Sequence, residues 1–131
     1  MLSKERVFQQ AVSNLSIGQR LYNFPQTALD FTQSSFVYSC TALRLFVRYM
    51  CMDSGLSYEK CEEMTFRESV EFVKEHCNVS SEFLTSLETR EDEISLCADY
   101  VSSNYKHRVP YELITDTLKL AESALSETKC R

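Results

Sequence analysis

Hydrophobic and small residues recur three or four positions apart in residues 4–22, which places them on one face of a helix. These are Val7, Ala11, Leu15, Gly18 and Tyr22. Pro25 follows and disfavours helix at the residue before it, so the segment is expected to end there. Because Gly18 has no side chain, we expect a second helix to approach this one closely.

The next segment, residues 27–53, is the most apolar in the chain. Its apolar residues cover most of the circumference of a helix, and a helix of this kind lies at the centre of a fold. Arg44 and Arg48, four positions apart, occupy the remaining polar strip. Gly55 suits the position just after a helix end.

Two further helices are predicted in the middle of the chain. Thr65 and Glu68 have the spacing of a capping box, in which a hydroxyl and a carboxylate cap the first turn of a helix. An amphipathic pattern follows over 66–77. Ser80 can cap the next segment, 82–104, which reads as one long helix or as two helices with a kink.

A last amphipathic helix follows Pro110, and we place its start at Thr115 or Asp116, either of which is a plausible cap. The chain has two glycines and two prolines, too few for the many tight turns of a sheet protein. The pattern therefore predicts an all-α fold, an up-and-down bundle of about five helices. Its 131 residues suit a single domain spanning 1–131.

The net charge of −5 argues against broad non-specific binding to nucleic acid, which depends on many Lys and Arg residues. Six cysteines are present without a CxxC pair, so no metal site is indicated. The first residues show no signal peptide, and no apolar run reaches the length of a membrane span. We therefore expect reduced thiols, no membrane contact and a cytoplasmic location.

A local basic run, Lys106, His107 and Arg108, contrasts with the acidic chain, and Tyr105 and Tyr111 flank it. The run either clamps a phosphate or offsets the negative end of a helix dipole. The two tyrosines either stack on a base or pack their rings on the bundle.

Arg44 and Arg48 present a similar choice. They either line a groove that accepts phosphates, pair with nearby acidic residues, or extend into solvent. The acidic candidates are Glu59, Glu62 and Glu63. These two arginines are second-choice contacts for a nucleotide.

Several stretches resemble HEPN domains, and the sacsin-like members in particular. Residues 6–22 resemble the first helix of that family, and residues 31–56 resemble its apolar second helix. Residues 105–112, followed by 114–125, resemble its closing segment. The resemblance implies a helical bundle that forms a homodimer through its long helices and holds a nucleotide or RNA in a groove.

Many HEPN proteins are ribonucleases that carry Arg, four to six residues, and then His. Here Arg67 precedes His76 with eight residues between them, and Arg90 precedes His107 with sixteen between. The catalytic pair is therefore not carried over, and an enzyme is not the first expectation.

The resemblance implies instead a non-catalytic nucleotide-binding module, with ATP or GTP held by residues around Lys106, His107 and Arg108. Two alternatives stay open. One is a ribonuclease with a degenerate motif, in which His107 acts as general acid or base. The other is a helical bundle that binds a protein partner and no nucleotide.

Overall fold

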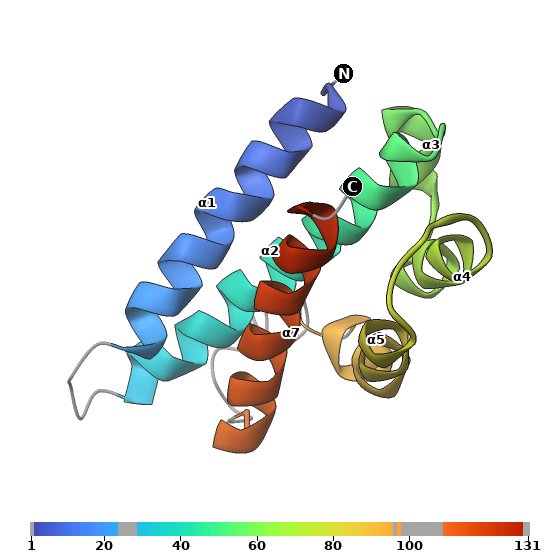
Figure 1. The fold of residues 1–131 in the computed structure, drawn as a ribbon. Helices are drawn as coiled ribbons and strands as arrows, with labels where there is room; N and C mark the ends of the chain where they lie inside the picture. Colours follow the sequence, from blue (N-terminus) through green and yellow to red (C-terminus); the bar gives the residue numbers. More distant parts are fainter. Residues whose placement is uncertain (1, 24–28, 96, 98–108, 130–131) are drawn as a thin grey trace.

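The computed structural model describes residues 2–23, 29–95, 97 and 109–129, and this part of the chain contains helices and no strand. The all-α prediction is thus confirmed (Figure 1). The described helices are α1 Lys4–Tyr22, α2 Leu29–Asp53, α3 Tyr58–Glu63, α4 Phe66–His76, α5 Ser81–Ser95 and α7 Tyr111–Lys129. None of them is long and apolar enough to cross a membrane.

The apolar helix α2 lies at the centre of the bundle, as its sequence predicts. It packs against α1, α7, α4 and α3 (Figure 1). Phe36, Leu43, Phe46 and Met50 of α2 are completely buried. A helix contacted from several sides has to be apolar around most of its circumference, which explains its composition.

Gly18 permits the close approach of α1 and α2 that the sequence predicts. The hydroxyl of Ser35 donates a hydrogen bond of 2.7 Å to the carbonyl of Gly18. A Cβ atom at Gly18 would lie 3.0 Å from Oγ of Ser39, closer than ordinary van der Waals contact. The missing side chain therefore sets the spacing of these two helices.

The capping box before α4 is present. Backbone N–H of Glu68 donates to the hydroxyl of Thr65, and the Glu68 carboxylate accepts from the backbone N–H of Thr65. The short helix α3 was not predicted. Its six residues are too few to show a period, and its visible signals are the N-cap Ser57 and the buried Cys61.

The predicted start of the last helix, Thr115 or Asp116, is wrong. The helix α7 begins at Tyr111, and the backbone N–H of Ile114 already donates to the carbonyl of Pro110. Leu113 and Ile114 are buried. Their packing against the core starts the helix about one turn earlier in the chain than Thr115.

Ser80 caps α5, as predicted, because its hydroxyl accepts from the backbone N–H of Phe83. The predicted segment 82–104 is helical through Ser95. Most of its remainder lies outside the described residues.

Candidate functional site

The basic run that the sequence singles out, Tyr105, Lys106, His107 and Arg108, lies outside the described residues. The chain that follows it is held in place. Val109 is buried, its N–H donates to the side-chain oxygen of Gln33 at 2.8 Å, and its carbonyl accepts from the Gln33 amide at 3.0 Å. The start of α7 is thereby fixed against the N-terminal half of α2.

A pair of tyrosines lies where α1 ends and α7 begins. The rings of Tyr22 and Tyr111 stack, with centroids 5.7 Å apart and planes at 25°. The hydroxyl of Tyr111 donates to that of Tyr22 at 2.8 Å. Hydroxyls of Tyr22 and Thr115 are also 2.8 Å apart, and Thr115 donates to the carbonyl of Tyr111 at 3.1 Å. We call Tyr22, Tyr111 and Thr115 the tyrosine platform.

The platform presents one ring to solvent. Tyr111 is 63% exposed, and no other large hydrophobic side chain of the described residues is mostly exposed. Its contact with Tyr22 covers part of the ring, and the hydrogen bond to Tyr22 restrains its rotation. The structure thus shows a ring that both packs on the bundle and faces outward.

The hydrogen bonds of the platform shift its two phenols in opposite directions. The pKa of Tyr22 is lowered by its hydrogen bonds with Thr115 and Tyr111. The pKa of Tyr111 is raised because its proton is shared with Tyr22. The positive charge of Lys119, one turn beyond Thr115, also lowers the pKa of Tyr22.

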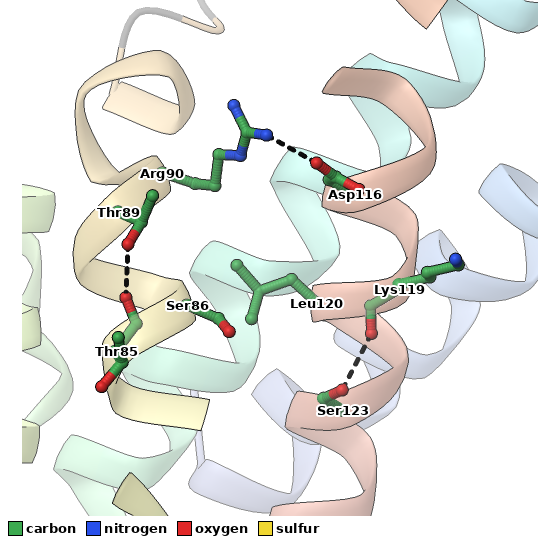
Figure 2. Close-up of a pocket in the computed structure, with 8 residues that line it drawn as sticks. All are labelled: Thr85, Ser86, Thr89, Arg90, Asp116, Lys119, Leu120 and Ser123. Carbon is green, nitrogen blue, oxygen red and sulfur yellow. Dashed lines mark hydrogen bonds and ion pairs between the residues drawn. The ribbon is translucent and has the colours of Figure 1, made fainter. Parts of the chain in front are cut away.

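A groove lies on another side of α7, between α7 and α5 (Figure 2). It consists of two hollows of about 400 and 270 Å³ that share Ser86, Leu120 and Ser123. We call it the α5–α7 groove. Polar contacts join the two helices near each end: Arg90 with Asp116, and the backbone of Ser80 with Glu127.

Hydroxyl side chains line the walls of this groove, above the nearly buried Leu120. They are Ser80, Thr85, Ser86, Thr89, Ser123 and Ser126. Thr85 donates to the carbonyl of Ser81, Thr89 to that of Thr85, and Ser123 to that of Lys119. These hydroxyl protons are directed along the helices, and oxygen lone pairs remain for a ligand.

The two arginines of α2 lie away from the tyrosine platform. Arg44 and Arg48 belong to the C-terminal half of α2, whereas the platform adjoins the end of α1 and the start of α7. Arg44 is exposed, and the Arg48 guanidinium lies over the ring of Tyr58, 5.5 Å from its centroid. Within the described chain neither arginine forms an ion pair with the acidic candidates on α3.

The five cysteines of the described chain carry free thiols, and Cys130 lies outside it. Burial raises the pKa of the Cys51 thiol to about 12. Among the described residues no three His, Cys, Asp or Glu side chains gather in a way that could hold a metal ion.

Sequence reasoning missed most of these features. Gln33 carries no pattern that separates it from other polar helix residues, and the sequence indicates Thr115 only as a helix cap. The sequence does contain one signal for the groove: Thr85 and Thr89 lie four positions apart, which places both hydroxyls on one face of their helix. Only the packing of α5 against α7 shows that this face borders a hollow.

No protein-family model matches the sequence, and no characterised protein or solved structure matches it either. The resemblance to HEPN domains therefore stays a prediction.

Proposed function

We propose that this chain is a non-catalytic module that binds a nucleotide such as ATP or GTP, with the base stacked on Tyr111. The observation that carries the proposal is the ring of Tyr111, which is 63% exposed yet held by stacking and a hydrogen bond. An exposed aromatic ring offers a base a stacking contact worth roughly 1–3 kcal/mol. Because Tyr22 already restrains the ring, a ligand loses little free energy in ordering it.

The charge of Lys119 supports the phosphate half of the proposal. The charge of Lys119 acts on Tyr22, and its side chain is exposed. Lys106 and Arg108 precede Tyr111 by a few residues in the sequence, and their assignment to the phosphates rests on the sequence alone. We include the homodimer that the HEPN resemblance implies, which light scattering with and without nucleotide would test.

The groove expected of an apolar protein-interaction bundle has less support. Such a site needs a contiguous apolar patch of several hundred Å². In the described part of the chain the large hydrophobic side chains other than Tyr111 are buried or half-buried. A nucleotide, which is polar and has one flat face, suits this surface better.

The affinity for a nucleotide is expected to depend on the ring of Tyr111, on which the nucleotide base stacks. In calorimetric titrations with ATP, GTP and inorganic tripolyphosphate, we expect saturable binding of the nucleotides. Tyr111→Leu removes the ring, and a stacking contact of roughly 1–3 kcal/mol corresponds to about 5- to 150-fold weaker nucleotide binding. Tyr111→Phe keeps the ring and retains most of the affinity. Tripolyphosphate has no base, so its affinity does not change in either variant.

Tyr58→Leu is the matched control, because Tyr58 lies beside Arg48 and away from the platform. It leaves nucleotide affinity unchanged. Joint replacement of Lys106 and Arg108 by alanine, or Lys119→Ala alone, weakens both nucleotide and tripolyphosphate and reduces the dependence on salt. Absence of binding at millimolar nucleotide, or equal affinity of Tyr111→Leu and the unaltered chain, contradicts the proposal.

A further inference from the structure

The α5–α7 groove is elongated and is separate from the tyrosine platform. Ser80 and Glu127 lie at one end, and Arg90 and Asp116 at the other. Ser80 and Arg90 are ten positions apart, which corresponds to about 15 Å at the rise of an α-helix. This length fits a short extended segment of polypeptide better than a single small ion.

Most of the hydroxyl groups in the walls of the groove offer a hydrogen-bond acceptor, because their protons are already bonded within their own helices. Hydroxyl protons of Thr85, Thr89 and Ser123 are bonded to carbonyls of their own helices, at 2.9, 2.8 and 3.0 Å. A hydroxyl that donates in this way still has lone pairs to accept a hydrogen bond. A ligand that carries N–H donors therefore finds more partners here than one that carries only acceptors.

Of the two cations that border the groove, Arg90 is paired with carboxylates and Lys119 is directed elsewhere. The guanidinium of Arg90 is bonded to Asp116 and also lies 3.4 Å from the carboxylate of Glu93. In Figure 2 the ammonium of Lys119 points away from Arg90 and from the hollow.

The second hollow is lined by acidic residues and has no cation among its described residues, unlike the first. Two carboxylates, Glu82 and Glu127, line it together with serines, and no Lys or Arg is among its lining residues. Phe83 and Leu120, both nearly buried, form its apolar part.

We infer that the α5–α7 groove binds a lysine- or arginine-bearing segment of a partner protein. The carboxylates of Glu82 and Glu127 and the hydroxyl oxygens accept hydrogen bonds from the cationic head groups. The aliphatic stem of a Lys or Arg side chain packs on Phe83 and Leu120, as such stems commonly do on apolar surface. This inference does not depend on nucleotide binding, since it uses another face of α7.

The test uses an end-blocked hexapeptide of alternating lysine and serine as the probe. Titration of the full chain, followed through backbone amide chemical shifts, is expected to move resonances of α5 and α7 in a saturable way. The same peptide with acetylated lysines keeps its length but loses its charge, and it does not bind. Equal binding of the acetylated peptide, or shifts spread evenly over the chain, overturns the inference.

A pair of double variants separates the groove from general attraction to an acidic protein. Joint replacement of Glu82 and Glu127 by glutamine is expected to weaken peptide binding about two- to thirtyfold, because two exposed ion pairs are lost. Glutamine at 127 keeps an oxygen that can accept from the backbone of Ser80. Joint replacement of Glu59 and Glu62 on α3 by glutamine changes the net charge equally and leaves binding unchanged. Equal weakening by both double variants overturns the inference.

Discussion

At the scale of the residue, Gly18 sets the distance between α1 and α2. The space for its missing Cβ is partly taken by the hydroxyl of Ser39, a buried group with no hydrogen-bond partner among the described residues. Ser35 donates to the Gly18 carbonyl from the same side. Glycine in a helix costs about 1 kcal/mol relative to alanine, so the close packing of α1 and α2 has to offset that cost.

A double-mutant cycle tests this reading of Gly18. In a Ser39→Ala background, Gly18→Ala is expected to raise the free energy of unfolding by about 1 kcal/mol through helix propensity. In the unaltered chain Gly18→Ala raises the free energy of unfolding clearly less, because the new methyl group contacts the Ser39 hydroxyl. Denaturant unfolding of the four proteins measures the difference, and additive effects of the two changes would argue against the contact.

At the scale of the element, local signals decided some helix boundaries and packing decided others. The start of α4 follows from Thr65 and Glu68, which interact within one turn and need no other part of the chain. The start of α7 does not follow from its cap-like residues, because burial of Leu113 and Ile114 extends the helix to Tyr111. The free energy gained by burying two apolar side chains exceeds that of a helix cap, which is about 1 kcal/mol.

The capping box of α4 makes a prediction that depends on pH. Thr65→Ala is expected to lower the free energy of unfolding by about 1 kcal/mol. The pKa of Glu68 is lowered because its carboxylate accepts from the backbone N–H of Thr65. The contribution of the Glu68 carboxylate to stability is therefore present above the pKa that Glu68 has in the unfolded chain. It is lost as the pH falls through the pKa that Glu68 has in the folded chain.

Denaturant unfolding between neutral and acidic pH measures this contribution. Glu68→Gln removes the carboxylate and is expected to reduce the loss of stability on acidification. Glu75→Gln, an exposed acidic residue at the other end of the same helix, is the control. An unchanged acid dependence in Glu68→Gln would contradict the assignment.

At the scale of the whole molecule, α2 packs against α1, α3, α4 and α7, and α5 joins the same apolar core through α4 and α7. Cys51 belongs to this core, and its thiol contacts the backbone carbonyl of Ser69 on α4 at 3.7 Å. Burial raises its pKa from 9.0 to about 12, because a thiolate would be poorly solvated there. The protonated thiol is thus the form that the folded state requires.

The stability of the molecule is therefore expected to fall in alkaline solution. The contribution of the Cys51 thiol to stability is complete below its unfolded pKa near 9.0. It is lost as the pH rises towards its folded pKa of about 12. Thermal unfolding between pH 8 and 11 measures the slope. Cys51→Ala should lower stability at pH 8 but show a shallower decline with pH than Cys77→Ala does. Equal slopes would contradict this role of Cys51.

The linear sequence is enough to predict the helical class, the central place of α2, the close approach at Gly18 and the caps of α4 and α5. These features depend on periodicity and on contacts within one helical turn, which a linear pattern records. The packing of the helices is needed to explain the start of α7, the stacking of Tyr22 on Tyr111 and the hydroxyl-lined groove between α5 and α7. Those features join residues that are distant in the chain, and their partners are chosen by how the buried faces pack.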